Sequence, residues 1–496
     1  MADEPMNALP PSRGGKNQAA NAAGSDNQSL YADRVRIYPQ KVEGAFRRFK
    51  WTALIVLLAI YYLAPWLRWD RGPGAPDQAL LIDMPARRAY FFFIEIWPQE
   101  IYYLTGLLVL GAVGLFLVTS LFGRVWCAYS CPQTVWTDLF MWVERMVEGD
   151  RNARMRLDKG RWTAERIIKK ITKHAIWVAI ALLTGGAWVM YFTDAPTLII
   201  DILNFQVSGA VLFFILMFTA TTYLLAGIAR EQLCVYMCPW PRFQAAMYDE
   251  DTLTVTYEDW RGEPRGKHKT GASWEDRGHC VDCLQCVNVC PTGIDIRDGS
   301  QLECIGCGLC IDACNRIMTR LDLPKGLIRL DTVSNQVARA EGKSAPFRLL
   351  RPRTIIYTGL LALVAAVMLF GLTTRSTLEV SLLRDRNPLF VTLSDGTIRN
   401  GYIFKIINRA RADREFILTL DGIEDATIAV LGGSSGSGAA VFSTRPDQVE
   451  TFRVFVTAPR QALAGESTDL SFVLKEDAME NGEDVVQGTV FLGPKQ

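Results

Sequence analysis

Residues 280–291 read CVDCLQCVNVCP, and residues 304–315 read CIGCGLCIDACN. Both runs follow the pattern Cys-x2-Cys-x2-Cys-x3-Cys. Three thiolates at the shorter spacing can wrap around three corners of one iron–sulfur cubane, while the fourth, beyond three residues, points away from it. Zinc knuckles need two cysteine pairs and would leave the extra thiols without a role. The spacing therefore predicts two [4Fe-4S] clusters.

The two runs resemble those of bacterial two-cluster ferredoxins, in which each run gives its last cysteine to the other cluster. This resemblance implies two ligand sets, which are Cys280, Cys283, Cys286 and Cys314 for the first cluster, and Cys304, Cys307, Cys310 and Cys290 for the second. Gly306 and Gly308 would let the backbone approach the cluster sulfides closely. Asn315 stands where ferredoxins have a second proline, but this change removes no ligand.

Composition places these runs in a larger membrane protein. The chain has 496 residues, 49% of them hydrophobic, and a net charge of +1. That length requires several structural parts, and no basic stripe indicates nucleic-acid binding. The tight cysteine spacing favours metal binding in a reducing compartment over disulfides. Residues 1–45, rich in Ala, Gly, Asn, Ser and Pro, are expected to form a disordered cytoplasmic tail.

Five apolar stretches are long enough to cross a bilayer, which takes roughly 20 residues. They lie at 51–67, 99–122, 172–193, 207–229 and 354–374. Lys and Arg gather before the first stretch and between the second and third, and such clusters mark the cytoplasmic side. We therefore expect a cytoplasmic N-terminus, a cytoplasmic loop 230–353 and a periplasmic C-terminus in a bacterial inner membrane. Four arginines in the loop 68–98 run against this assignment.

A second cysteine system follows the second and fourth stretches. Residues 126–132 read WCAYSCP and residues 233–239 read LCVYMCP, which indicates an internal duplication. Cysteines four residues apart share one helix face, and soft thiolates select Cu(I). Nearby Arg124 and Arg230 are expected to lower the thiol pKa values. The catalytic and copper-binding candidates are thus Cys127, Cys131, Cys234 and Cys238, with a redox dithiol as the alternative to a copper site.

Beyond residue 375 apolar and polar residues alternate. Candidate strands lie at 377–384, 389–394, 401–408, 414–420, 426–431, 451–457, 468–474 and 485–492. They predict a cysteine-free, immunoglobulin-like β-sandwich without a catalytic pattern. The expected organisation is a tail (1–45), spans one to four (46–247), a cytoplasmic ferredoxin-like α+β insert (248–350), a fifth span (351–375) and the sandwich (376–496).

As a whole, the chain resembles the cytochrome c oxidase accessory protein family, called CcoG or FixG and including RdxA-like proteins. The resemblance covers about residues 31–495 and includes the loops RGEPRG (261–266) and LPKGLIR (323–329). It implies a membrane polyferredoxin and cupric reductase that converts Cu(II) to Cu(I) for assembly of cbb-type cytochrome oxidase. The implied partners are that oxidase or its copper chaperones and a cytoplasmic electron donor. The oligomeric state stays open, with a homodimer as one option.

Our working hypothesis passes electrons from the donor, through the clusters, to copper held by the four membrane-edge thiols. Two alternatives remain. The chain could bridge a quinol or flavoprotein donor to a periplasmic acceptor, or it could be a non-catalytic assembly scaffold whose clusters are structural.

Overall fold

The computed structural model of the chain describes residues 36–494 apart from short gaps. The gaps are 73–74, 269–273, 344–346, 375–377, 409–412, 432–433, 436–438, 446–447 and 477–484. Most of the expected tail, up to residue 35, lies outside the described residues. The chain forms two compact units, one ending at Met368 and the other beginning at Leu369.

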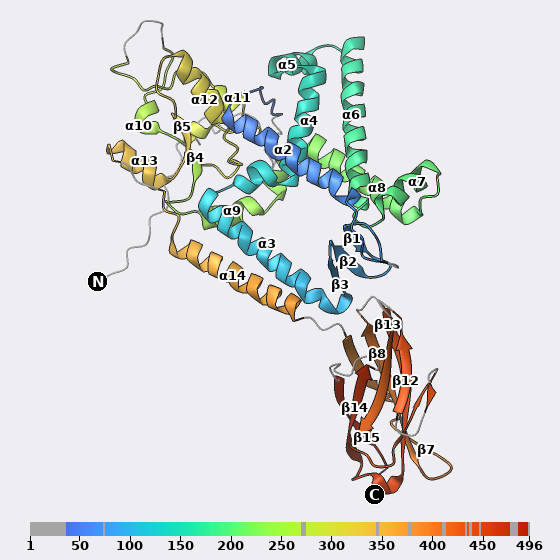
Figure 1. The fold of residues 1–496 in the computed structure, drawn as a ribbon. Helices are drawn as coiled ribbons and strands as arrows, with labels where there is room; N and C mark the ends of the chain where they lie inside the picture. The colour runs from blue at the N-terminus through green and yellow to red at the C-terminus, as the bar shows by residue number, and fades with distance from the viewer. Residues whose placement is uncertain are drawn as a thin grey trace, which may run out of the picture. The chain divides into compact units, whose positions relative to one another are not determined.

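Helices dominate the first unit (Figure 1). They include α2 (Ala45–Leu63), α3 (Ile101–Phe122), α4 (Pro132–Glu148), α5 (Arg151–Lys159), α6 (Ala164–Val189), α7 (Ala195–Leu203), α8 (Gly209–Thr222), α9 (Trp240–Met247) and α14 (Pro352–Thr373). Within the described residues, four helical segments are long and apolar enough to cross a membrane, namely Ala45–Trp66, Pro98–Phe122, Gly209–Ala229 and Pro352–Thr373. These segments coincide with four of the five predicted spans.

The predicted third span, 172–193, falls on α6 and is not among those four segments. The first turns of α6 carry Lys169, Lys170 and Lys173, so its uninterrupted apolar part is shorter than the roughly 20 residues that a bilayer needs. The helix packs closely on α8, because a Cβ on Gly185 would lie 2.7 Å from the Ile215 carbonyl oxygen. The number of spans therefore stays a prediction.

The loop 68–98 contains a three-stranded sheet that the sequence did not predict, made of β1 (Leu80–Asp83), β2 (Arg88–Phe91) and β3 (Ile94–Ile96). Three of its four arginines bind groups inside the loop or next to it, whereas Arg87 is exposed. Arg71 is 1% exposed and donates to the carbonyl oxygens of Phe92, Pro76, Gln78 and Ala79. Arg88 pairs with Glu95 at 3.0 Å, and Arg68 pairs with Asp194. These structural roles explain why arginines occur in a loop expected on the periplasmic side.

The cysteine runs lie in an α+β insert, as predicted. Strands β4 (Thr254–Tyr257) and β5 (Ile328–Asp331) pair antiparallel and bracket both runs. Between them lie α11 (Gln285–Asn288) and α12 (Leu309–Arg320), preceded by α10 (Asp259–Gly262) and followed by α13 (Val333–Ala340). Asp312 of α12 also accepts the backbone N–H groups of Phe46 and Arg47, at 3.3 and 2.8 Å. The insert therefore supplies the N-terminal cap of α2, whose own cap residue is Gly44.

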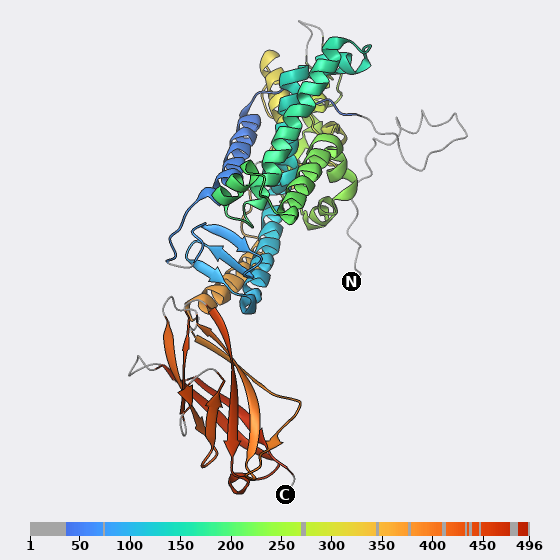
Figure 2. The ribbon, with the colours of Figure 1, turned by 90° about the vertical axis from the view of Figure 1, so that its right-hand side faces the viewer.

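The second unit consists of two antiparallel sheets (Figures 1 and 2). One has the order β10-β13-β8-β6 with β7 beside β8, and the other has the order β11-β12-β9-β14-β15. The strands are β6 (Leu378–Arg384), β7 (Val391–Thr392), β8 (Ile398–Asn408), β9 (Arg414–Asp421), β10 (Thr427–Val430), β11 (Ser434–Ser435), β12 (Ala439–Thr444), β13 (Gln448–Ala458), β14 (Ser467–Glu476) and β15 (Val485–Leu492).

Each of the eight candidate strands overlaps an observed strand, which confirms the predicted sandwich. Its core holds Phe404 and Phe472, whose rings meet edge to face at 4.7 Å. The prediction missed β12 because its short apolar part follows the glycine-rich stretch after Leu431, which was interpreted only as a turn.

Candidate functional site

The two cysteine runs adopt the same backbone path. Gly306 and Gly308 have φ values of 72° and 71°, and the equivalent positions of the first run, Asp282 and Leu284, have φ values of 51° and 56°. Left-handed backbone is costly for a bulky residue such as Leu, so this geometry is imposed by the site. At Gly308 a side chain would also strike Phe46, since a Cβ there would lie 2.4 Å from that ring.

Two small cavities divide the eight cysteines. Cys280, Cys283, Cys286 and Cys314 line one of them, together with Tyr257 and Leu327. The other is lined by Cys290, Cys304, Cys307 and Cys310, and Cys286 lines both cavities. Cys314 thus lines the first cavity beside three cysteines of the first run, and Cys290 lines the second cavity beside three cysteines of the second run. This arrangement is compatible with the ligand sets that the ferredoxin resemblance implies. In the part of the chain that the structure describes, no three Cys, His, Asp or Glu side chains converge on one metal ion. The spread thiols of both cavities fit a cubane better than a single zinc ion.

Burial dominates the electrostatics of these thiols. It raises the pKa values of Cys286, Cys304 and Cys314 to about 12, with neighbouring cysteines adding to the effect at Cys314. Arg297 lies beside the first cavity, 3.9 Å from the Cys280 sulfur, and pairs with Asp282 and Asp295. These contacts raise the pKa of Arg297, so it supplies a fixed positive charge there. Nothing in the sequence pattern had singled out Arg297.

The two Cys-x-Tyr-x-Cys-Pro motifs also share one conformation, as expected if they arose by duplication. Each is a π-helical turn, Trp126–Ser130 in the first motif and Leu233–Met237 in the second. Each turn ends at an extended cysteine that precedes a proline, and that proline opens α4 or stands next to α9. Such π-turns are frequent at functional sites. In this register Arg230 corresponds to Gly123, and the two have similar φ values of 47° and 58°.

The two motifs converge. Cys131 lies close enough to Cys127 and Cys234 that its negative charge adds to the rise in the pKa of both. The charge of Cys234 likewise adds to the rise in the pKa of Cys127. Cys238 is exposed, whereas the other three thiols are partly buried. The four thiols share one neighbourhood but do not form a closed cage.

The expectation that the arginines lower these thiol pKa values is wrong. Burial, with Cys131, raises the pKa of Cys127 to about 12, and Arg124 offsets only part of this. Burial likewise raises the pKa of Cys234 to about 11. The guanidinium of Arg230 instead binds Glu144, with N–O distances of 2.8 and 3.0 Å.

The first motif contacts the loop of the second cysteine run directly. The Tyr129 hydroxyl donates to the Cys307 carbonyl oxygen at 3.0 Å. Arg124 donates to the carbonyl oxygens of Cys304, at 2.8 Å, and Leu302. Arg124 also donates to the carbonyl oxygen of Pro241, just beyond the second motif, at 3.0 Å. Arg124 therefore ties both motifs to the second cavity, a role that its sequence position did not reveal.

Buried Gln244 of α9 completes this neighbourhood. The Cys127 thiol donates to its side-chain oxygen at 3.4 Å, and its amide nitrogen lies 3.5 Å from the Thr119 hydroxyl. Gln244 is fully buried. Its distance in sequence from Cys127 gave no signal by which it could have been found.

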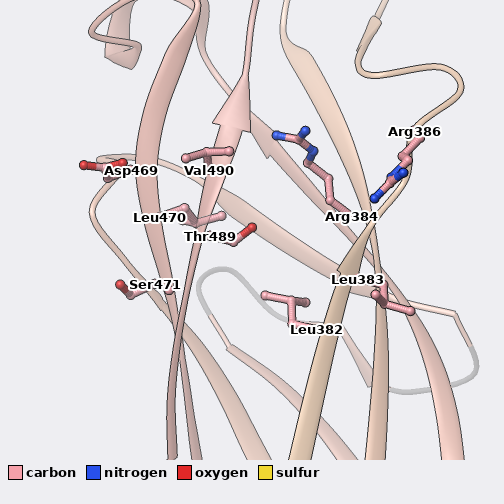
Figure 3. A pocket seen from close by; sticks show the side chains of 10 residues that line it. Leu382, Leu383, Arg384, Arg386, Asp469, Leu470, Ser471, Thr489 and Val490 are labelled. Atoms are coloured by element: carbon pink, nitrogen blue, oxygen red, sulfur yellow. The ribbon is translucent and has the colours of Figure 1, made fainter.

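The second unit carries a separate open cavity of about 770 Å³ (Figure 3). It lies along β6, β14 and β15, and its polar lining includes Arg384, Arg386, Asp469, Ser471 and Thr489. No cysteine occurs after Cys314, so this cavity has none of the thiol chemistry of the first unit.

Known families and proteins match all these parts. A family described as a 4Fe-4S dicluster domain matches residues 229–333, a 4Fe-4S binding domain matches residues 104–148, and a family described as the IG-like fold at the C-terminus of FixG matches residues 368–494.

The chain is 50% identical over 487 residues to the nitrogen fixation protein FixG of Rhizobium meliloti, covering 92% of this chain and 93% of that protein. Protein RdxA of Cereibacter sphaeroides is 49% identical over 456 residues, covering 91% of this chain and 95% of RdxA. Protein RdxB of the same organism is 48% identical over 473 residues, covering 95% and 98%.

Proposed function

The chain belongs to the FixG family of membrane polyferredoxins, and from this premise we propose that it reduces Cu(II) to Cu(I) for assembly of a cbb-type cytochrome oxidase. It is an iron–sulfur electron-transfer protein of the membrane with an oxidase-related function. The copper substrate, the thiols that hold it and the partners are the proposed parts.

One observation carries the proposal: the first thiol motif lies directly on the second cysteine cavity. Tyr129 bonds to Cys307 and Arg124 bonds to Cys304, so no further residue separates the two systems. An electron that reaches the second cavity is thereby delivered next to Cys127 and Cys131. This arrangement supports a relay rather than a free-standing ferredoxin module.

The eight cysteines would hold two [4Fe-4S] clusters in the sets already given, and bound clusters supply one-electron transfer. Gly306 and Gly308 let backbone N–H groups approach the second cluster, while Arg297 places positive charge beside Cys280. The apolar wall around both cavities, including Ile296 and Ile311, excludes water.

Copper is the substrate in this proposal, and each Cu(II) ion takes up one electron to become Cu(I). The exposed thiol of Cys238 gives access from solvent, and the partly buried Cys127, Cys131 and Cys234 offer soft sulfur that prefers Cu(I). Cu(I) would then pass to a copper chaperone or to the oxidase. The electron would come from a cytoplasmic donor.

We also propose the inner-membrane topology with a cytoplasmic N-terminus and a periplasmic sandwich. The strongest sequence objection was the set of arginines in the loop 68–98. Arg71 is buried among carbonyl oxygens and Arg68 and Arg88 pair with Asp194 and Glu95, whereas Arg87 is exposed. The larger clusters of Lys and Arg before the first span and between the second and third outnumber these four arginines.

The test compares cupric reductase activity of the full-length protein, purified anaerobically, with that of the double variant Cys127→Ser/Cys131→Ser. We expect the variant to keep its iron and its EPR spectrum but to lose copper reduction and copper binding. The matched variant Cys234→Ser/Cys238→Ser should lose both as well. Unchanged copper reduction and binding in both variants would overturn the assignment of these thiols.

A further inference from the structure

A cavity of about 860 Å³ opens between the start of α2 and the last turns of α4. None of the twelve cysteines lines it, and its walls include Lys41, Arg47, Arg48, Trp51, Trp142 and Arg145. Residue 45 begins one of the four segments that can cross a membrane, so the cavity lies where that segment would enter the bilayer.

Its charge is strongly positive. Four cationic side chains and one acidic side chain, Glu43, line it. Glu43 pairs with Lys41 at 2.9 Å, and Arg47 is held by Asp138 at 2.8 Å. Arg48 is exposed, and no partner for it occurs among the described residues. Within the part of the chain that the structure describes, the Arg48 guanidinium at this cavity therefore has no carboxylate paired with it.

Arg145 adds a second cation in a crowded position. Its side chain is 15% exposed, and its nearest carboxylate oxygen, on Asp138, is 3.7 Å away and already bound by Arg47. Burial and the positive charge of Arg47 and Arg154 lower the pKa of Arg145, and the carboxylates of Asp138 and Asp150 offset only part of this. An anion in the cavity would relieve this repulsion.

The remaining wall is apolar and aromatic. The rings of Trp51 and Trp142 meet edge to face at 6.1 Å, and the Arg47 guanidinium lies 4.9 Å from the Trp51 ring centre. Trp142 and Met146 are 42% and 57% exposed. Tryptophan beside arginine is typical of the depth at which lipid headgroups meet acyl chains.

We propose that this cavity binds the phosphate-bearing headgroup of an anionic phospholipid, with its acyl chains along Trp142 and Met146. Basic pockets beside membrane helices recognise such headgroups. The planar guanidinium groups of Arg48 and Arg145 match phosphate geometry better than a lysine would. The bound lipid fastens the start of α2 to α4, the helix that begins just after Cys131. This inference is independent of copper reduction.

The test uses native mass spectrometry of the full-length, cluster-containing protein in detergent, titrated with phosphatidylglycerol, phosphatidylcholine or glycerol phosphate. We expect wild type to retain phosphatidylglycerol in preference to phosphatidylcholine. Retention should weaken roughly fivefold in Arg48→Gln and further in Arg48→Gln/Arg145→Gln, as for the loss of single charges at a membrane surface. The control Arg353→Gln, which removes an exposed cation at the start of α14, should bind like wild type.

Arg48 is exposed and has no buried partner in the described part of the chain, so Arg48→Gln should fold like wild type. The single variant therefore still tests the proposal if the double variant loses its iron. Equal retention of the two lipids by wild type, or unchanged retention in Arg48→Gln, would overturn the proposal. Glycerol phosphate binding as tight as phosphatidylglycerol binding would also overturn it, because the site would then recognise a soluble phosphate rather than a lipid.

Discussion

The Tyr129 hydroxyl donates a hydrogen bond of 3.0 Å to the carbonyl oxygen of Cys307, across 178 positions of sequence. Its counterpart in the second motif, Tyr236, is 73% exposed. The two motifs are alike in backbone and sequence, yet only the first is bonded through its tyrosine to a cysteine cavity. This asymmetry gives a matched pair of residues for testing the relay.

Tyr129→Phe should weaken the link between the first motif and the second cluster. The Cys307 carbonyl would lose its buried donor, which costs about 1 kcal/mol. We expect a lower thermal midpoint and a changed EPR signal of the second cluster. Tyr236→Phe removes an exposed hydroxyl and should change neither. Equal effects of the two substitutions would contradict the asymmetric link.

Arg124→Gln and Arg230→Gln should separate two roles that the sequence could not distinguish. Loss of Arg124 removes charged donors from Cys304 and Pro241, at about 1.5–3 kcal/mol per bond, and should perturb the second cluster's EPR spectrum. Loss of Arg230 leaves Glu144 short of a partner, at about 3–5 kcal/mol, and should lower the thermal midpoint more while leaving that spectrum intact. The opposite pattern would show that Arg230, not Arg124, supports the cluster.

The exchange of last cysteines predicts which variants share a spectrum. Cys314→Ser should remove the same cluster signal as Cys283→Ser, and Cys290→Ser the same signal as Cys307→Ser, because each pair lines one cavity. Each variant should retain about half of the iron of wild type. Anaerobic EPR with iron counting makes the comparison. If Cys314→Ser instead matched Cys307→Ser, each run would hold its own cluster.

Glu144 should make stability depend on pH. Burial raises the pKa of Glu144, but Arg230, Arg154 and Lys173 outweigh it and lower the pKa to about 2 from an ordinary value of 4.5. A carboxylate with a lowered pKa stabilises the fold above its unfolded pKa, and this contribution fades as pH falls from about 4.5 toward 2. The gap in thermal midpoint between wild type and Glu144→Gln should therefore be constant from pH 6 to 8 and shrink below pH 5.

The matched control for this prediction is Glu165→Gln, which removes a solvent-exposed carboxylate paired with Lys169. Its midpoint should stay close to that of wild type throughout, because exposed pairs contribute little. A gap for Glu144→Gln that persisted unchanged down to pH 3 would contradict the assigned pKa.

The sequence predicted the features that depend on residue spacing and on the periodicity of apolar residues. The Cys-x2-Cys-x2-Cys-x3-Cys runs, the paired thiol motifs and the alternation of β8 and β13 all rest on short-range patterns. It could not predict the roles of Arg124, Gln244 and Arg297, because those roles depend on contacts between segments that are far apart in the chain. The left-handed backbone at Leu284 could not be predicted, because glycine is the residue from which that conformation is usually inferred.

One expectation failed for a physical reason. Proximity in sequence suggested that Arg124 and Arg230 would lower thiol pKa values, but burial of Cys127 and Cys234 outweighs any such effect, and Glu144 occupies Arg230. The four arginines of the loop 68–98 ran against its expected periplasmic position, and the structure buries one of them, Arg71. In both cases the sequence shows where the charged residues stand but not whether they are buried or paired.

The cap that Asp312 provides to α2 has a consequence for biosynthesis. The N–H group of Arg47 bonds to a carboxylate 265 positions later in the chain, on the helix that carries Cys310 and Cys314. A ribosome makes α2 long before that carboxylate exists. The first turn of α2 therefore completes its hydrogen bonding only once the iron–sulfur loop has been synthesised and has folded against it.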